Sequence, residues 1–303
     1  MFRAFPSFPM NKIAEVQARP HDFRLIERIP LTLNGCPALP AIFNPPVGDE
    51  KIMAILDFET TGLEHDTSEV IELGLVKVSY SPSAMRITAV LDVLSAYEEP
   101  KKPISELITA LTGITDEMVA GKRIDDAAVN EKLRDVDLIV AHNASFDRPF
   151  FDRRFPGHEG RAWACSASGV DWPGLGFESR KLEYLLMRLG YFYEGHRAAT
   201  DCLAVVWLLN TLPEALAGLI AGANVRTVRI AAFGAPFDVK DELKGRGYRW
   251  HDGTTGANKH WGTEINADDV PAELAYLDGL YQNASHKVGM TTLDCTSRFK
   301  GVA

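Results

Sequence analysis

The chain has few cysteines, and their spacing does not suggest pairing. It contains 4 cysteines in 303 residues, and no two of them form a C-x-x-C pair. They are Cys36, Cys165, Cys202 and Cys295. Disulfide frameworks and zinc sites place cysteines at close, regular spacings. We therefore expect reduced thiols, and neither a disulfide framework nor a zinc site.

Long apolar segments are also missing. The longest apolar run, Leu203 to Leu209, is far shorter than the roughly 20 residues that a membrane-spanning helix needs. The first residues, MFRAFPSFPMNK, have no apolar signal segment. We expect a soluble, cytoplasmic protein without membrane contact.

Basic residues are in the minority. There are 32 lysines and arginines against 41 acidic residues, which gives a net charge of −9. Proteins that hold nucleic acid through charge alone are usually basic, so a high-affinity non-specific binder is disfavoured. The balance still allows an enzyme that grips a short stretch of phosphate through metal ions and a local basic patch.

The length of 303 residues predicts one large and one smaller domain. Residues 1–50 are rich in proline and predict an irregular arm with one short helix near residues 22–28. Residues 51–215 carry strands followed by helix–strand alternation, which predicts an α/β domain with a mixed sheet. Residues 225–303 predict a small α+β module in the order βαββα.

Within 51–215, the apolar patterns predict individual elements. Strands are expected over 51–59, 70–80 and 85–97 as an antiparallel meander, with a further short strand at 137–141. Helices are expected around 104–111, 125–133, 145–154, 181–189 and 199–212. Ser145 is the expected N-cap of the helix that ends at residue 154.

The motif LDFETTG, residues 56–62, carries the first chemical signal. On a strand, Asp57 and Glu59 share one face, and Phe58 points the other way into the core. Two carboxylates side by side on a buried strand repel each other, and a divalent cation such as Mg²⁺ or Mn²⁺ removes that repulsion. The alternative is a strand-end turn with solvated acids.

The second motif is AHNASFDRPFF, residues 141–151. Asp147 falls in the first turn of the predicted helix, as a metal ligand or as a helix-capping acid. Nearby arginines either track a phosphate backbone or solvate the helix face: Arg148, Arg153 and Arg154. Two adjacent rings stack on bases or fill the core, and burial is favoured for at least one of them: Phe150 and Phe151.

The third motif is GHRAATDCLAVVWLL, residues 195–209. Asp201 begins a helix, and His196 lies in the glycine-containing turn before it. The H-x4-D spacing is weak evidence, because His142 and Asp147 have the same separation. A structural histidine is the alternative for His196, and its association with the acidic motifs favours a chemical role.

Together these motifs resemble the DEDDh family of 3′–5′ exonucleases, including the proofreading (epsilon) subunit of bacterial DNA polymerase III and its stand-alone relatives. LDFETTG, HNASFD and GHRAATD match the family's three motifs, and LTGITDEMV and SRKLEYLLMRLG also look like family sequence. The resemblance covers about 51–212. It implies a ribonuclease H-like mixed β-sheet flanked by helices, and release of nucleoside 5′-monophosphates from 3′ ends.

The resemblance also implies roles for individual residues. Asp57, Glu59 and Asp201 would hold one Mg²⁺ or Mn²⁺ ion. Asp57 would bridge to a second ion, which Asp147 would reach directly or through water. His196 would take the proton from the attacking water. Substrate contacts are expected from the backbone at Thr60, Gly62 and Leu63, and we add the ring of Phe151.

Several alternatives stay open at this level. The expected partner is a single-stranded or frayed DNA 3′ end, while an RNA-trimming exoribonuclease and a non-catalytic accessory protein of a replication assembly are the rivals. Replication proteins and a homodimer are open as further partners. The C-terminal module interleaves basic and aromatic residues, as a single-strand grip would: Lys244, Arg246, Tyr248, Arg249, Trp250, Lys259, His260 and Trp261. A small core or a dimer contact built on Trp250 and Trp261 is the favoured alternative.

Overall fold

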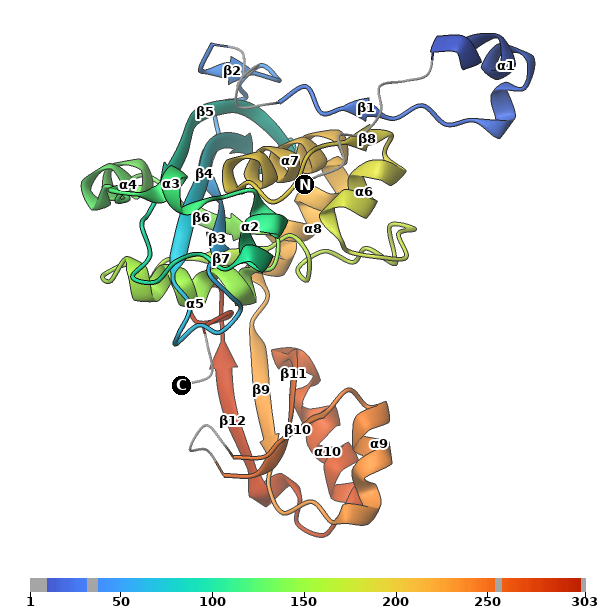
Figure 1. The fold of residues 1–303 in the computed structure, drawn as a ribbon. Helices are drawn as coiled ribbons and strands as arrows, with labels where there is room; N and C mark the ends of the chain where they lie inside the picture. The colour runs from blue at the N-terminus through green and yellow to red at the C-terminus, as the bar shows by residue number, and fades with distance from the viewer. Residues whose placement is uncertain (1–9, 32–37, 254–257, 301–303) are drawn as a thin grey trace.

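The computed structural model describes residues 10–31, 38–253 and 258–300 (Figure 1). Its largest sheet has the strand order β2-β5-β4-β3-β6-β7. The strands are β2 (Ala41–Ile42), β3 (Lys51–Thr60), β4 (Val70–Ser81), β5 (Arg86–Tyr97), β6 (Leu138–Ala141) and β7 (Trp163–Cys165). β3, β4 and β5 form the predicted antiparallel meander, and β6 and β7 continue the sheet parallel to β3. The predicted α/β fold with a mixed sheet is thus confirmed.

Helices cover both faces of this sheet, which explains why β3 is apolar on both sides. The helices are α2 (Glu106–Thr112), α3 (Asp116–Val119), α4 (Asp126–Leu133), α5 (Ala144–Arg154), α6 (Leu182–Arg188), α7 (Ala198–Thr211) and α8 (Pro213–Asn224). Met53 and Ile55 pack into one core with α6, α7 and α8, and Ala54 and Leu56 pack into a second core with α4 and α5. Every helix predicted in this region is present, and four further elements were not predicted: α3, α8, β7 and β8 (Tyr191–Phe192).

Gly74 on β4 sets the distance between the sheet and α7. A Cβ atom at this position would lie 2.2 Å from the backbone carbonyl carbon of Ala198, the first residue of α7. Gly74 is also the register partner of Asp57 on β3. The missing side chain therefore allows the start of α7 to lie directly against the sheet beside Asp57.

The N-terminal arm differs from the sequence-based expectation. Residues 22–28 do not form a helix; the helix of the arm is α1 (Ile13–Ala18), and β1 (Glu27–Arg28) pairs in parallel with β8 (Tyr191–Phe192). The backbone N–H of Glu27 donates to the carbonyl of Gly190 at 2.8 Å. A long-range strand pairing thus overrides the local amphipathic pattern. Figure 1 shows α1 extending away from the sheet.

The thiol prediction agrees with the described residues. Cys165 and Cys202 are free and buried, and Cys295 is free and partly buried. Cys36 lies outside the described residues.

In the described part of the chain, no single helix is long and apolar enough to span a membrane, although α7 and α8 pass that test as a pair bent by 106°.

The C-terminal region forms a second sheet with the order β10-β11-β9-β12. Its elements are β9 (Thr227–Ala232), α9 (Lys240–Gly245), β10 (Arg249–His251), β11 (His260–Asn266), α10 (Val270–Leu280) and β12 (Val288–Leu293). β12 was not expected, so the order is βαββαβ. Tyr248 and Trp261 fill a separate core, whereas Trp250 is 51% exposed. The chain boundaries at 50, 215 and 225 stay predictions.

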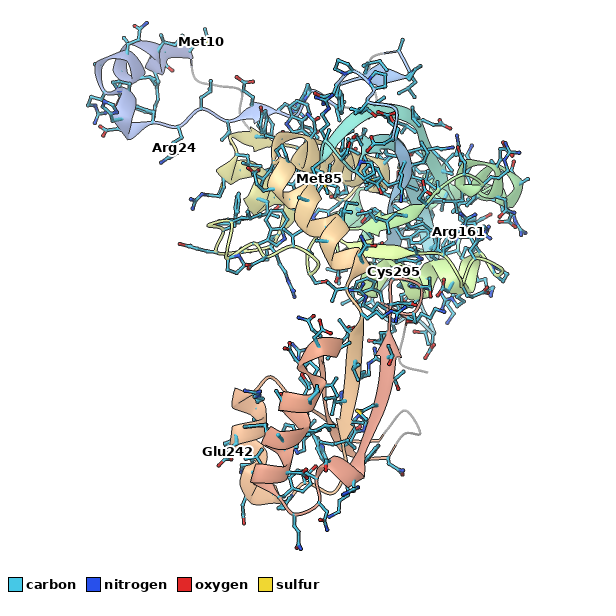
Figure 2. All side chains as sticks on the ribbon, turned by 180° about the vertical axis from the view of Figure 1, so that it is seen from behind. Met10, Arg24, Met85, Arg161, Glu242 and Cys295 are labelled. Atoms are coloured by element: carbon cyan, nitrogen blue, oxygen red, sulfur yellow. The ribbon has the colours of Figure 1, made fainter. Side chains whose placement is uncertain are left out.

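After β12 the chain returns to the main sheet. The N–H of Trp163 donates to the carbonyl of Cys295 at 2.7 Å, and Figure 2 shows Cys295 at the junction between the two sheets. The C-terminal sheet is therefore fastened to the main sheet by two connections at the same end, the α8–β9 connection and this return.

The close approach at Gly74 generates a prediction for stability. Gly74→Ala should lower the free energy of unfolding by about 1–3 kcal/mol, because the added methyl group overpacks a backbone contact that cannot yield. Chemical denaturation measures this change. Gly160→Ala is the matched control, since a Cβ atom there meets nothing within 4 Å. Equal stability of the two variants would show that α7 does not need this approach.

Candidate active site

The carboxyl end of β3 brings together acids from two distant segments. Asp57 and Glu59 share one face of β3, and Phe58 between them is buried in the core on the other face. Asp201 lies in the first turn of α7. One carboxylate oxygen from each of Asp57, Glu59 and Asp201 lies within 4.8 Å of the others.

Asp201 is held in place by its own helix turn. Its carboxylate accepts hydrogen bonds from the backbone N–H of Arg197 at 3.1 Å and from the hydroxyl of Tyr193 at 3.0 Å. The approach at Gly74 places this turn over β4. The position of Asp201 therefore follows from the packing of α7 on the sheet.

Asp147 lies on the other side of β3, next to β6, the second strand that pairs with β3. It lies in the first turn of α5, directly after β6, and only 2% of it is exposed. Its carboxylate accepts a hydrogen bond from the N–H of Phe58 at 3.2 Å. α5 begins at Ala144 with Asn143 at the N-cap position, so the N-cap predicted at Ser145 is wrong by two residues. The left-handed φ of Asn143, 146°, makes the sharp turn out of β6.

These carboxyl groups perturb each other strongly. Burial, followed by the charges of Asp147, Asp201 and Glu59, raises the pKa of Asp57 well above its ordinary value. Burial raises the pKa of Glu59 to about 8, with Asp201 adding to it, and burial raises the pKa of Asp147 to about 8. The pKa of Asp201 is raised to about 6, again mainly by burial. Such a group of hard oxygen donors fits a divalent cation, which would favour their ionised forms.

The two histidines of the H-x4-D pairs differ in their surroundings. Both ring nitrogens of His142 are engaged, with the Ser166 hydroxyl at 2.9 Å and the carbonyl of Arg180 at 2.8 Å. Burial lowers the pKa of His142 to about 4, so its ring is neutral. His196 is exposed, in the turn before α7, with a left-handed φ of 65°. Of these two rings, His196 is the one placed to exchange protons with solvent.

An ion pair between a buried acid and a partly exposed arginine, next to the acid group, was not predicted from the sequence. Glu72 on β4 is fully buried and is the register partner of Glu59. The guanidinium of Arg197 donates to the Glu72 carboxylate at 3.1–3.3 Å and also to the hydroxyl of Tyr97. Arg197 is thereby anchored to the sheet, and with it the turn that carries His196. The sequence signal that could have indicated this ion pair was a single acid, Glu72, within the apolar strand VIELGLV.

The residues predicted to contact substrate differ in how far they are exposed. Thr60 is buried and donates its hydroxyl to the carbonyl of Gly62 at 2.6 Å, and Leu63, after the end of β3, is 77% exposed. Phe151 is fully buried between Phe155 and Trp163, with both ring centroids at 5.3 Å. The assignment of Phe151 to substrate binding is therefore wrong, because its ring has no free face.

Arg148 holds the fold instead of facing solvent. It is fully buried, and its guanidinium donates to the carbonyls of Arg298 at 2.7 Å and of Glu159 at 2.9 Å. It thereby ties the C-terminal return to α5. Neither of the two roles predicted for this side chain, tracking phosphate or solvating a helix face, applies.

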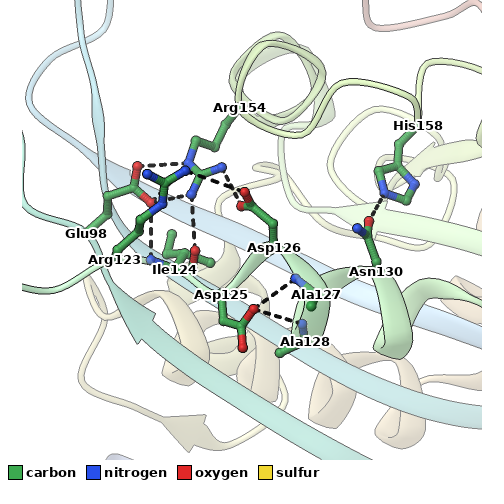
Figure 3. Close-up of polar contacts among 10 residues, drawn as sticks. All are labelled: Glu98, Arg123, Ile124, Asp125, Asp126, Ala127, Ala128, Asn130, Arg154 and His158. Atoms are coloured by element: carbon green, nitrogen blue, oxygen red, sulfur yellow. Dashed lines mark hydrogen bonds and ion pairs between the residues drawn. The ribbon is translucent and has the colours of Figure 1, made fainter.

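Arg153 and Arg154 are engaged as well. Arg154 binds Glu98 at 2.7–3.0 Å and Asp126 at 2.7 Å, as Figure 3 shows. Arg153 donates to the carbonyl of Ser68, and its guanidinium lies 5.3 Å from the ring centroid of Phe150. These arginines fasten α5 to its neighbours.

Comparison with known proteins places this site in a family. The sequence profile of RNase_T, the exonuclease family, matches residues 54–209, which is more than half of the chain. The chain therefore belongs to this exonuclease family, as its motifs predicted, and is an enzyme of the exonuclease class. Divalent-metal dependence is a property of the family, and the group of Asp57, Glu59 and Asp201 fits it.

The curated relatives that match this chain are much longer proteins. DNA polymerase III PolC-type of Thermotoga maritima is 33% identical over 142 residues, which are 46% of this chain and 9% of the polymerase. The PolC-type polymerase of Bacillus subtilis is 36% identical over 110 residues, 34% of this chain and 7% of that one. The matched region thus spans about a tenth or less of these polymerases.

Solved structures give weaker likenesses. "Exonuclease X in complex with 5′ overhanging duplex DNA" has a TM-score of 0.41 and 25% identity, and the match covers 53% of this chain and 90% of that one. A 3′-exonuclease described with a histone mRNA stem-loop has a TM-score of 0.42 and 18% identity, over 54% and 81% of the two chains.

The raised carboxyl pKa values predict how pH and metal change stability. The pKa values of Glu59 and Asp147, each about 8, exceed those expected in the unfolded chain, so the metal-free folded state binds more protons than the unfolded state between about pH 4 and pH 8. The contribution of these groups to the free energy of unfolding should therefore fall as pH rises through that window. Mg²⁺ should reverse this loss, because it favours the ionised carboxylates.

Thermal unfolding in EDTA and in Mg²⁺ tests this. At roughly 100 times the dissociation constant, Mg²⁺ should raise the midpoint by about 5–10 °C at pH 8, and by less at pH 5. The double variant Asp57→Asn/Glu59→Gln keeps the shapes of the side chains and serves as control. An equal Mg²⁺ effect in that variant would place the cation elsewhere.

Proposed function

We propose that this protein is a metal-dependent 3′–5′ exonuclease that releases nucleoside 5′-monophosphates from DNA 3′ ends and prefers single-stranded or frayed ends. The observation that carries the proposal is the convergence of Asp57, Glu59 and Asp201 within 4.8 Å at the carboxyl end of β3. DNA is favoured over RNA because the named relatives are DNA polymerases.

The acids would hold the metal. Asp57, Glu59 and Asp201 would ligate one ion, and Asp57 together with Asp147 would reach a second. When bound, Mg²⁺ or Mn²⁺ would activate the attacking water and neutralise the charge that develops on the phosphate oxygens. A framework of β3, α5 and α7 keeps these side chains in place before substrate arrives, so little rearrangement is needed.

His196 would act as the general base. Its ring is exposed at the edge of the acid group, and an imidazole takes and releases protons near neutral pH. The ion pair between Arg197 and Glu72 would keep the adjacent turn fixed while the ring moves. His196 would accept the proton of the attacking water and pass it to solvent.

Binding of the terminal nucleotide would fall to the turn after β3. The hydrogen bond from Thr60 to the carbonyl of Gly62 fixes this turn, and a Cβ atom at Gly62 would lie 2.8 Å from the hydroxyl oxygen of Ser68. The exposed side chain of Leu63 offers an apolar surface to a base. An unpaired 3′ end reaches this turn without the cost of opening a duplex.

A variant of the proposed base gives a direct prediction. His196→Ala should lower turnover by ~10²–10⁴ while metal-dependent stabilisation is unchanged, because only proton transfer is lost. Steady-state release of nucleotides measures it. His158→Ala, which removes a ring that contacts Asn130 outside the acid group (Figure 3), should leave turnover unchanged. Full turnover in His196→Ala would mean that another group is the base.

The substrate is tested by digestion of end-labelled single-stranded, duplex and mismatched oligonucleotides, each as DNA and as RNA, with Mg²⁺, Mn²⁺ or EDTA. We expect stepwise loss from the 3′ end of single-stranded DNA with either metal and no reaction in EDTA. Faster degradation of RNA would transfer the proposal to an exoribonuclease. Failure to release mononucleotides under every condition would leave the accessory-protein alternative.

A further inference from the structure

The C-terminal sheet has one covered and one open face. Val228, Ile230 and Ala232 of β9 point into the core that the sheet forms with α9 and α10. Between them, Arg229 and Ala231 point to the opposite face and are only partly buried. Figure 1 shows both helices on the same side of this sheet. The face that carries Arg229 is therefore turned away from the core of its own module.

Small residues form the floor of the open face. Gly262 on β11 and Gly289 on β12 are both register partners of Ala231 on the strand between them. Three neighbouring strands thus present a hydrogen atom or a methyl group at the same level. This part of the sheet has no large side chains of its own, so neighbouring rings can lie over it.

Three rings lie around this floor. His251 and His260 are register partners, and their rings stack with centroids 4.7 Å apart and planes at 12°. The ring of Phe233 lies 5.3 Å from that of His260. A Cβ atom at Gly262 would come within 2.9 Å of the His251 ring, and one at Gly289 within 3.1 Å of the Phe233 ring. The glycines are what allow these rings to lie over the sheet.

Positive charge accompanies the rings. Arg249 is the register partner of Gly262 and so shares its face, and Arg229 lies on the same face. Burial, then the charges of His260 and Arg229, lowers the pKa of His251. Two acids lie nearby: Glu264 accepts the hydroxyl of Thr227 at 2.6 Å, and the charge of Asp252 acts on the pKa of His251 in the opposite direction. A local basic and aromatic surface thus exists on a chain whose net charge is −9.

One end of this face borders a groove that it shares with loops of the main domain. A groove of about 990 Å³ is lined by Arg229 and Glu264 on the open face and, across from them, by His65, Ser145 and Ser168. His65 and Ser168 belong to the loops that follow β3 and β7. Ser145 lies on α5, two residues before Asp147. The groove thus joins the open face to the loop that follows β3, the strand that carries Asp57 and Glu59.

We propose that this open face, which we call the ring platform (Phe233, His251 and His260 with Arg229 and Arg249), binds the single-stranded part of the DNA substrate behind its 3′ end. The proposal rests on the proposed function. Unpaired bases stack on aromatic rings without sequence preference, and arginines neutralise the phosphates between them. The platform would supply the local basic patch that an acidic nuclease needs in order to retain its substrate.

Binding of a fluorescently labelled 15-nucleotide oligo(dT) to the full chain in EDTA, followed by anisotropy, tests the platform without cleavage. Phe233→Ala should weaken binding by about 5- to 150-fold, the range for loss of one stacked base. Arg229→Ala should weaken binding and reduce the slope of log affinity against log salt by about 0.7. Phe237→Ala is the matched control: its ring is 75% exposed beside Lys240, and its loss should change nothing.

Two further arms keep the result decisive. Phe233→Tyr retains a ring and should restore the affinity that Phe233→Ala loses, which separates stacking from misfolding. Hydrolysis of a dinucleotide should be unaffected in Phe233→Ala, while KM for the 15-mer rises. Equal oligonucleotide affinity in wild type, Phe233→Ala and Arg229→Ala would overturn the platform. Tight binding by a wild type that releases no nucleotides would instead overturn the proposed function and leave the platform standing.

Discussion

Repulsion among partly buried carboxylates is the interaction on which this structure depends. Asp57, Glu59 and Asp201 converge within 4.8 Å, and Asp147 adds to the repulsion at Asp57. Burial and these mutual charges raise their pKa values, so the metal-free site favours protonation. A divalent cation favours the opposite state, with every carboxylate ionised. An arrangement of this kind would therefore favour binding of a divalent cation.

The surrounding framework prevents the acids from moving apart. β3 is central and covered on both faces, Gly74 brings α7 against the sheet, and the N–H of Phe58 fixes Asp147. The buried pair of Glu72 and Arg197 fastens the turn before α7. Relaxation of the acids toward solvent would disrupt these contacts. Rigidity of this kind suits catalysis that works through positioning and charge.

Local patterns in the sequence predicted the meander, the helices of the main domain and the acidic motifs, because strand alternation and helical periodicity are properties of neighbouring residues. Features that depend on distant partners were not predictable in this way. β1 pairs with β8 and β12 pairs with β9 across long stretches of chain. The burial of Phe151 and Arg148 follows from packing against segments far away in sequence, and the pairing of Glu72 with Arg197 likewise joins two distant motifs.

In the C-terminal sheet, the sequence showed that aromatic and basic residues alternate, but not which face of the sheet each side chain occupies. Trp261 is buried in the core, and His260 beside it lies on the open face.

Anomalous diffraction from crystals soaked in Mn²⁺ is the decisive measurement for the acid group. Mn²⁺ should bind between the carboxylates of Asp57, Glu59 and Asp201. Crystals in which Mn²⁺ binds only at other positions would show that these carboxylates do not share a cation.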